Sequence, residues 1–420
     1  MKINMKKVIG LAAAVAMLTP LAACGSDGGS NAASNGTSAS GTTEVALKVW
    51  APQADQTAES GDSWLATVEK SFEKAHPEYK ITWTNDVVGE DDAAKTVKQD
   101  AASAADVYMF GNDQLGTLIE SKAIGQLGTD AEKRVKEQSD AATLQSVTFT
   151  DGKLYGVPYT GNTWFMYYNK SKFSADDVKS LDAMLAKGKV AFQIGGPWYY
   201  TSFYTGAGAK FFGSDGMTAS EGIKLGDKAA DVTKYLADLA NNPNFVVDDG
   251  TTGIAGLQNG SVDAYFDGTW NASKAKAALG DNYAAAPAPS FTVNGESIQM
   301  TPFSGSKAAA YNPNSKNAKA AAQFAAFLGS TESQKSHYTM SGVTPSDKSL
   351  ASTATDPASK AQMDTIANIA VTQPTISAMN NFWDPATTFG NGLKNKDVTP
   401  SNAAEKVAEF QAQLDAAQKK

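Results

Sequence analysis

The sequence predicts an α/β fold built around a parallel β-sheet. Between residues 45 and 121, stretches patterned as strands and helices alternate in the order β-α-β-α-β-α, which is typical of parallel sheets with helices on both faces. The chain from Glu44 to Lys420 is long enough for two domains of ordinary size. Because 42% of the residues are hydrophobic, we expect a substantial core.

Start and stop signals indicate the individual elements of this first part. Ser63 is a helix-capping residue, and apolar residues recur at helical spacing along Trp64–Ala75 until Pro77 ends the helix. Because ligands bind at the carboxyl ends of strands in such sheets, the turns after Trp50 and Phe110 are candidate site positions. The expected elements are strand 45–51, helix 63–75, strand 79–83, helix 91–103, strand 106–110 and helix 113–121.

Beyond residue 147 the pattern is more mixed. Asp151-Gly152 is a hairpin signal. Gly195-Gly196-Pro197 breaks a strand before an aromatic cluster that runs from Trp198 to Tyr204. The expected elements are the extended segments 158–163 and 164–168, helix 181–187, strand 190–194, helix 229–240, strand 262–266, and helices 318–328 and 402–418.

The first 43 residues have the layout of an export signal followed by a tether. Three lysines precede an apolar stretch of about 11 residues, which is shorter than the roughly 20 needed to cross a bilayer. Leu21-Ala22-Ala23-Cys24 resembles the lipobox of bacterial lipoproteins, which implies a signal peptide at 1–23 and a lipid on Cys24. The alternative is ordinary secretion with cleavage near Ala23. Residues 24–43 are rich in small polar residues and predict a flexible tether with a reach of roughly 25 Å.

The composition excludes several kinds of partner and reaction. The formal net charge is −8 and becomes −11 without the three lysines of residues 1–23, so we expect no nucleic-acid partner and no charge-driven adhesion to anionic lipid. The one cysteine cannot form a disulfide within the chain, and His76 and His337 belong to no metal-binding pattern. We therefore expect no cofactor, no metal and no His-dependent catalysis, whereas carboxylate chemistry stays open.

Tryptophans that follow turns are candidates for a binding surface. Trp198, Trp270 and Trp383 each follow a break in the pattern, and aromatic rings on loops are available to ligands. An indole matches the flat C–H face of a pyranose ring in shape. The alternative is that each ring only anchors its own loop.

Adjacent carboxylates occur at Asp91-Asp92, Asp176-Asp177 and Asp248-Asp249. Such pairs are usually solvated or lie at helix N-termini. A glycoside hydrolase needs two carboxyl groups about 5 to 9.5 Å apart across the sugar. A hydrolase is therefore the alternative from a second class of function.

Six motifs point to one family. They are residues 105–110 (ADVYMF), 113–116 (DQLG), 151–158 (DGKLYGVP), 168–170 (YNK), 267–270 (DGTW) and 374–383 (PTISAMNNFW). From about Leu47 to the C-terminus, the chain resembles the extracellular solute-binding lipoproteins of ABC sugar importers. It is most similar to the maltose/maltodextrin-binding group, for which the last motif is the most specific.

The resemblance implies a periplasmic-binding-protein-like fold, in which hinge strands join two α/β lobes and a ligand cleft lies between them. Residues 44–160 and about 304–355 would form the N-terminal lobe, and residues 161–303 and about 356–420 the C-terminal lobe. The implied partners are an oligosaccharide, the permease subunits of an ABC transporter and, through the N-terminal lipid, the membrane. We expect a monomer.

The resemblance also implies site residues. Phe110 falls where the family has a stacking tryptophan, and Asp113 where it has a sugar-binding aspartate. Trp198 and Tyr199 match its aromatic pair. The expected ligand-binding residues are Gln53, Asp92, Phe110, Asp113, Gln114, Asn162, Trp198, Tyr199, Trp270 and Trp383; no catalytic residue is expected.

Several charged positions of the family are changed here. Asn162 and Gly196 replace two glutamates, Gln114 and Thr387 replace two arginines, and loop 52–55 lacks an Asp-Lys pair. Losing charge-assisted hydrogen bonds while keeping stacking residues favours longer or differently linked glucans over maltose. The sequence thus predicts a lipid-anchored receptor at the extracellular face of the membrane for maltodextrin-type α-glucans. A receptor for another oligosaccharide is the alternative.

Overall fold

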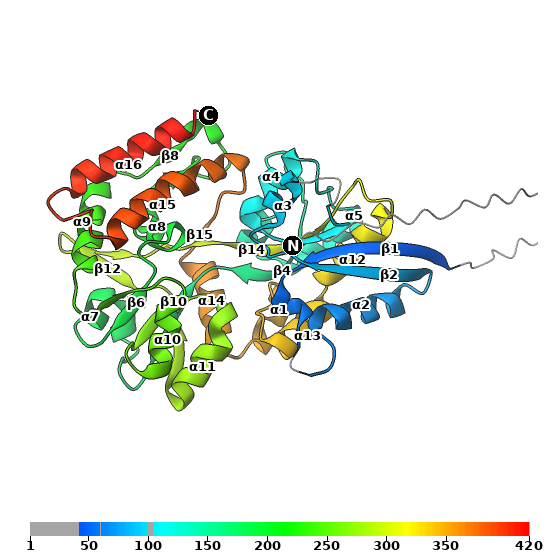
Figure 1. Ribbon diagram of the computed structural model, residues 1–420, viewed down its shortest axis with the longest axis horizontal. Coiled ribbons are helices and arrows are strands. Elements are labelled where there is room, and N and C mark those ends of the chain that lie inside the picture. The colour runs from blue at the N-terminus through cyan, green and yellow to red at the C-terminus, as the bar shows by residue number, and fades with distance from the viewer. Residues whose placement is uncertain (1–41, 59, 100–103, 420) are drawn as a thin grey trace, which may run out of the picture. The chain divides into compact units, whose positions relative to one another are not determined.

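The computed structural model describes residues 42–58, 60–99 and 104–419. The expected signal peptide, Cys24 and nearly all of the expected tether lie outside these residues. The described chain forms two lobes, each built on its own β-sheet (Figure 1). This agrees with the α/β fold that the sequence predicts.

The first lobe is built on six strands: β1 (Thr43–Ala51), β2 (Tyr79–Val87), β3 (Val107–Gly111), β4 (Val157–Asn162), β14 (Phe303–Tyr311) and β15 (Val371–Thr372). The order is β15-β14-β3-β1-β2, with β4 paired to β14. As the β-α-β order predicts, β1 is parallel to β2 and β3, whereas β14 is antiparallel to β3 and β4. Side chains alternate across the sheet, so Leu47 and Val49 enter one core and Trp50 enters another.

The second lobe is built on five strands: β5 (Phe165–Asn169), β6 (Val190–Phe192), β9 (Phe245–Val247), β10 (Ala264–Asp267) and β11 (Tyr283–Ala286). Their order is β11-β5-β10-β6-β9. Phe165 and Tyr167 enter the core on one face, and Met166 enters the larger core on the other. Two short antiparallel pairs complete this lobe: β7 (Lys210–Phe211) with β8 (Ile223–Lys224), and β12 (Ser290–Val293) with β13 (Glu296–Gln299).

Helices cover both sheets. Those of the first lobe are α1 (Gln53–Gln56), α2 (Trp64–Ala75), α3 (Ala93–Gln99), α4 (Leu115–Glu120), α5 (Thr129–Gln138), α6 (Ala141–Gln145), α12 (Ala318–Leu328) and α13 (Thr331–Ser341). Those of the second lobe are α7 (Leu181–Leu185), α8 (Pro197–Gly206), α9 (Ala229–Ala240), α10 (Thr252–Asn259), α11 (Ala272–Leu279), α14 (Pro357–Asn368), α15 (Asn380–Lys394) and α16 (Ala403–Ala417). Ser63 caps α2 as predicted, because its hydroxyl accepts a hydrogen bond from the Ala66 amide.

The chain passes between the lobes in extended segments. β4 of the first sheet leads through Trp164, which packs in the core of the second lobe, into β5 of the second sheet. β14 begins at Phe303 in that same core and runs into the first sheet, where Ala308 is buried. β15 pairs with the start of β14. These crossings bring both lobes against one cleft; the lobe boundaries expected from the sequence stay predictions.

Some elements differ from the sequence-based expectation. Asp151-Gly152 forms a tight turn with Gly152 at φ 75°, but it joins a single bridge, Thr148 to Leu154, rather than two strands. The aromatic cluster after Gly196 is a helix, α8, since Pro197 at its first position suits helix initiation. Residues 380–394 also form a helix, α15, although Pro385 lies within it. Trp198 and Trp383 are therefore helical rather than loop residues.

The aromatic core between α2 and α12 provides a test of the packing. Phe72 is fully buried, with its ring centroid 5.1 Å from Phe324 and 5.5 Å from Phe327. We expect Phe72→Ala to lower the free energy of unfolding by about 3–5 kcal/mol, because it leaves a cavity that the surrounding aromatic rings cannot fill. Urea denaturation measures the change. Lys70→Ala, on the exposed side of the same helix, is the control and should stay within about 0.5 kcal/mol of the wild type.

Candidate ligand cleft

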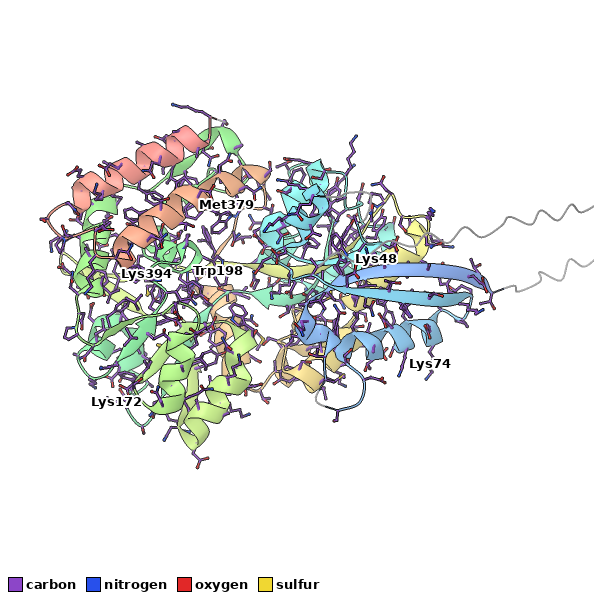
Figure 2. All side chains as sticks on the ribbon, viewed as in Figure 1. Lys48, Lys74, Lys172, Trp198, Met379 and Lys394 are labelled. Atoms are coloured by element: carbon purple, nitrogen blue, oxygen red, sulfur yellow. The ribbon has the colours of Figure 1, made fainter. Side chains whose placement is uncertain are left out.

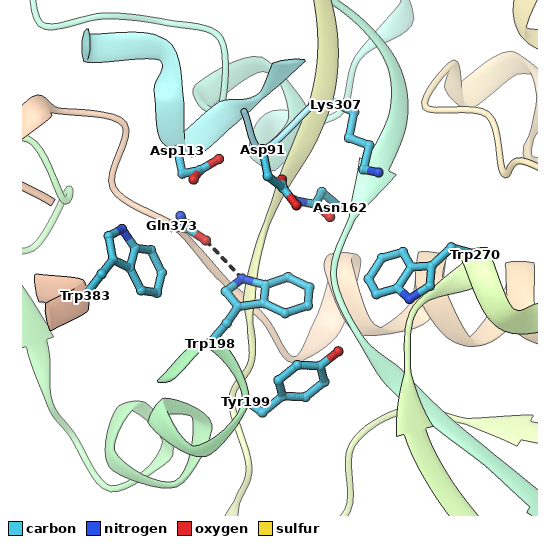
Figure 3. A pocket seen from close by; sticks show the side chains of 9 residues that line it. All are labelled: Asp91, Asp113, Asn162, Trp198, Tyr199, Trp270, Lys307, Gln373 and Trp383. Atoms are coloured by element: carbon cyan, nitrogen blue, oxygen red, sulfur yellow. Dashed lines mark hydrogen bonds between the residues drawn. The ribbon is translucent and has the colours of Figure 1, made fainter. Parts of the chain in front are cut away.

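A cavity of about 650 Å³ lies between the two lobes (Figure 3). This volume is within the usual range of small-molecule sites. Figure 2 shows Trp198 in the middle of the molecule, whereas Lys74 and Lys172 lie at the outer sides of the two lobes. The lining residues are Asp91, Asp113, Asn162, Trp198, Tyr199, Trp270, Lys307, Gln373 and Trp383.

One wall of the cavity is aromatic and comes from the second lobe. Trp198 and Tyr199 stand in the first turn of α8, where Gly196 and Pro197 direct the chain away from β6. The Trp198 indole nitrogen donates to Gln373 Oε1 at 3.0 Å, as the dashed line in Figure 3 shows. Tyr199 stacks on Trp164, with ring centroids 5.7 Å apart. Both rings are therefore fixed before any ligand binds.

Asp267 organises the turn that carries Trp270. Its buried carboxylate accepts hydrogen bonds from the Tyr199 hydroxyl at 3.0 Å, from the Gly268 amide at 2.8 Å and from Asn271 Nδ2 at 2.6 Å, and a further one from the Tyr265 hydroxyl. These contacts hold the short helix η5 (Thr269–Asn271) against the end of β10.

Trp270 folds back over Gly268. A Cβ at that glycine would lie 2.1 Å from the indole ring, so a larger residue there would displace the tryptophan. The indole remains 48% exposed. The third tryptophan, Trp383, lies at the opposite end of the cavity in Figure 3, and its neighbour on α15, Phe382, is buried. Aromatic rings thus lie along the cavity at differing tilts, with 36° between the planes of Trp198 and Trp270 and 88° between those of Trp198 and Tyr199.

The opposite wall is acidic and comes from the first lobe. Glu90 is held by two donors, the Tyr159 hydroxyl at 2.8 Å and Lys307 Nζ at 3.1 Å. Burial raises the pKa of the Glu90 carboxyl, but the charge of Lys307 and these hydrogen bonds outweigh that effect, so the pKa lies below its ordinary value. Lys307 also lies 5.6 Å from the centroid of the Trp270 ring. This lysine therefore connects the acidic wall to the aromatic wall.

Asp91 and Asp113 face the cavity from the same wall (Figure 3). Burial, followed by the charge of Asp91, raises the pKa of Asp113 to about 7. Loss of bulk water also raises the pKa of Asp91, although Lys307 opposes this rise. Among the described residues, neither carboxylate makes a hydrogen bond to another side chain. Both can accept hydrogen bonds from ligand hydroxyls.

Six of the ten expected site residues line this cavity: Asp113, Asn162, Trp198, Tyr199, Trp270 and Trp383. The other four do not. The expectation for Phe110 is wrong in this structure, because its ring is fully buried in the first lobe's core rather than available for stacking. Gln114 is also buried. Its amide oxygen accepts a hydrogen bond from the Ala94 N–H at 2.6 Å, and its amide nitrogen donates one to the Glu90 carbonyl at 2.6 Å. Gln114 therefore supports the turn at residues 90–92 and does not contact the cavity.

Gln53 and Asp92 are exposed and lie outside the cavity lining. Loop 52–55 folds into α1, which turns Asp55 inward, where its carboxylate contacts His337 Nε2 at 2.8 Å. In the turn at residues 90–92, Asp91 lines the cavity and its neighbour Asp92 does not. Adjacent residues of a turn point in different directions, which a sequence alignment alone does not resolve.

Sequence reasoning missed three lining residues: Asp91 as the cavity-facing acid, Lys307 and Gln373. The adjacent carboxylates Asp91 and Asp92 are visible in the sequence, but the sequence does not show which of the two side chains faces the cavity. Lys307 and Gln373 belong to β14 and to the segment after β15, which lie far along the chain from the other cleft residues. Arg134, the one arginine of the chain, donates to the Ala326 carbonyl and does not line the cavity.

Within 42–58, 60–99 and 104–419, no three His, Cys, Asp or Glu side chains are grouped so that they could hold a metal ion. In the same segments, no helix has the length and apolar character needed to cross a bilayer.

A cleft between two α/β lobes, with one stacking wall and one wall of hydrogen-bond acceptors, defines a two-lobed solute-binding protein. The family model described as bacterial extracellular solute-binding protein matches residues 67–366. Since this match covers most of the chain, the protein belongs to that family.

Known relatives are similar over nearly the whole length. The maltooligosaccharide ABC transporter solute-binding lipoprotein of Streptococcus pneumoniae is 29% identical, over 90% of this chain and 89% of its own. A solved structure determined with acarbose is 44% identical, with a TM-score of 0.84 over 88% of this chain and 98% of its own. The unliganded maltodextrin-binding protein MalE1 from L. casei BL23 is 30% identical, with a TM-score of 0.79 over 88% and 98% of the two chains.

We expect Asp113→Asn to change how stability depends on pH. The pKa of about 7 in the folded protein lies above the ordinary value of 3.8, so between these values the folded state binds more protons than the unfolded chain. The free energy of unfolding that this group contributes therefore falls as the pH rises from about 4 to 7. Asparagine cannot ionise, so the variant should lose this fall and exceed the wild type in stability at about pH 8.

Urea unfolding at about pH 5 and pH 8 measures the effect. Asp281→Asn, at an exposed position of the second lobe, is the control and should keep the wild-type pH dependence. The same pH dependence in wild type and Asp113→Asn would contradict the raised pKa.

Proposed function

We propose that this protein is the substrate-binding component of an ABC importer, which captures maltodextrin-type α-glucan oligosaccharides and delivers them to the permease. The observation that carries the proposal is the pairing of a tryptophan surface with a carboxylate wall across one cleft. The S. pneumoniae relative is named for maltooligosaccharides and the L. casei relative for maltodextrin, which supports the same class of ligand.

The chemistry of the two walls suits a neutral oligosaccharide. Each pyranose ring presents a flat C–H face to an indole and hydroxyl groups around its edge. Trp198, Trp270 and Trp383 offer three indole faces, and Asp91 and Asp113 accept hydrogen bonds from hydroxyls. Stacking removes apolar surface from water, and hydrogen bonds to charged acceptors are stronger than those to neutral ones.

Capture follows from the position of the cleft. A sugar that touches only one lobe makes only the contacts of that lobe, whereas closure adds the contacts of the other lobe. The ligand therefore shifts the equilibrium toward the closed form. The crossing strands β4 and β14 are the natural hinge, and the closed form is the one that the permease would recognise.

The proposed location is the extracellular face of the membrane. Residues 1–23 act as the signal peptide, Cys24 carries the lipid, and residues 24–43 serve as the tether. The relative of S. pneumoniae is named a lipoprotein, which supports this arrangement. The protein works as a monomer that needs no cofactor, and it does not bind nucleic acid.

We expect Trp270→Ala and Trp383→Ala each to weaken the binding of maltotetraose by about ten- to a hundredfold, because each removes a large apolar contact worth about 1.5–3 kcal/mol. Titration calorimetry on residues 44–420 measures the affinity. Trp83→Ala, a partly buried tryptophan of β2 outside the cleft, is the matched control and should bind as the wild type does. If only another oligosaccharide binds, for example raffinose or xylotriose, the receptor class is kept and the α-glucan ligand is wrong.

The alternative class, a glycoside hydrolase, would use the carboxylates of the acidic wall. We expect no turnover, since the protein binds sugar for transport. Chromatography of maltotetraose after prolonged incubation at equimolar protein should recover the sugar intact. Release of shorter sugars that Asp91→Asn or Asp113→Asn abolishes would instead establish the hydrolase.

A further inference from the structure

The segment that precedes Trp383 is held by both lobes. Residues 373–380 follow β15 of the first sheet and lead into α15 of the second lobe, which carries Trp383. The side chains of Ile376 and Met379 are buried in the core of the second lobe. The backbone and the polar side chains of the same segment form hydrogen bonds to α4 of the first lobe. The position of Trp383 therefore depends on a helix of the opposite lobe.

Two side-chain hydrogen bonds join this segment to α4. Asn380 Nδ2 donates to the Thr117 hydroxyl oxygen at 2.7 Å, and the Ser377 hydroxyl donates to Glu120 Oε1 at 2.6 Å. Thr117 is buried, whereas Glu120 is exposed. The bond to Thr117 is thus the better shielded from competing water, and it lies at the first residue of α15.

Gly116 lets the two backbones touch. Its amide donates to the Thr375 carbonyl at 2.8 Å. A Cβ at Gly116 would lie 2.6 Å from that carbonyl oxygen and 2.6 Å from the Ser377 amide nitrogen. Because both neighbours are backbone atoms, an added methyl group fits only if α4 and the segment separate. Alanine is ordinarily the better helix former, so this close approach is the physical reason that glycine suits the position.

α4 also continues directly from the turn that carries Asp113. The short helix η2 (Asn112–Gln114) ends one residue before α4 begins. Asp113 and Trp383 both line the main cavity, and Figure 3 shows both at the left of the view, with Trp270 at the right. One short stretch of the first lobe therefore supplies an acidic group of this end and holds the segment that leads to its aromatic group.

The other end of the segment is fixed as well. The Gln373 amide donates to the Ser304 carbonyl of β14 at 2.7 Å, and Gln373 Oε1 accepts from the Trp198 indole nitrogen at 3.0 Å. The segment is thus tied to β14 at its start and to α4 at Asn380. Trp383 follows Asn380 by three residues on α15, so the two are neighbours on one helix face. A displacement of Asn380 is therefore passed on to the indole.

We propose that Gly116 and Thr117 are positioning residues for the ligand. By holding residues 375–380 against α4, they set the separation between Asp113 and Trp383 and so the fit of the sugar unit between them. This inference rests on the proposed function, because both residues act through the stacking contact that Trp383 makes with the sugar. The competing interpretation is that the contacts of α4 only stabilise the fold.

The test is a double-mutant cycle. Titration calorimetry of residues 44–420 with maltotetraose is run on Gly116→Ala and Thr117→Val, each alone and each combined with Trp383→Ala. Thr117→Ser keeps the hydroxyl oxygen and is the conservative variant. Gly128→Ala, at the N-cap of α5 where a Cβ meets no atom within 4 Å, is the matched control. Thermal unfolding verifies that each variant is folded.

We expect Gly116→Ala and Thr117→Val each to weaken binding by about three- to tenfold, because a gap of about 1 Å already loses up to half of a van der Waals contact. Gly128→Ala and Thr117→Ser should bind as the wild type does. In the Trp383→Ala background, the same two substitutions should cost less than about twofold, since the contact that they position is gone.

A second readout needs no sugar. In protein labelled with 5-fluorotryptophan, the ¹⁹F resonance of Trp383 is assigned by its loss in Trp383→Ala. This resonance should shift in Gly116→Ala and Thr117→Val and stay in place in Gly128→Ala.

Two results would overturn the positioning role while the proposed function stands. One is a loss of affinity that is equally large with and without Trp383. The other is a lower unfolding temperature with unchanged affinity and an unshifted Trp383 resonance, which is the signature of a purely structural contact. If the wild type binds no oligosaccharide at all, the proposed function is wrong, and the positioning role for a sugar is wrong with it.

Discussion

The course of β14 is the constraint on which the cleft depends. The strand begins in the core of the second lobe at Phe303, pairs with both β3 and β4, and ends in the first lobe's sheet. Because β14 pairs with β3 and β4 at once, the ends of these strands and the start of the second lobe lie close together. Lys307 stands on this strand between the walls, where it pairs with Glu90 and lies over Trp270. A change in the path of β14 would separate the acidic wall from the aromatic one.

The two walls are stabilised in different ways. Asp267, a buried carboxylate with four donors, fixes the aromatic wall, and that network leaves little freedom to Tyr199 or to the turn of Trp270. The acidic wall holds charge that is only partly compensated: Lys307 neutralises Glu90, whereas Asp91 and Asp113 are left with raised pKa values. A rigid stacking surface thus faces two carboxylates that make no hydrogen bond to another side chain of the described residues. Ligand hydroxyls can donate hydrogen bonds to both.

Local sequence patterns predict many of the helices and strands that the structure contains. The helix at Trp64–Ala75, the parallel pairing of β1 with β2 and β3, and α9, α12 and α16 follow from periodicity and caps that the sequence carries. α15 is not among the elements expected from the sequence, and it contains Pro385, a residue type that ordinarily disfavours a helix interior. Motif resemblance brought six residues to the cavity, yet Phe110 and Gln114 lie in the core and in the turn behind the wall. The difference is one of side-chain direction, which changes at every residue of a strand or turn.

The sequence by itself determined the α/β class, the family motifs and the types of residue at the site, since these depend on composition and short-range spacing. Only the tertiary structure decided that Lys307, 217 positions from Glu90, neutralises it, and that the Asp55 carboxylate contacts His337. Each of these depends on long-range strand pairing and lobe packing. No local preference specifies which distant side chains such packing brings together.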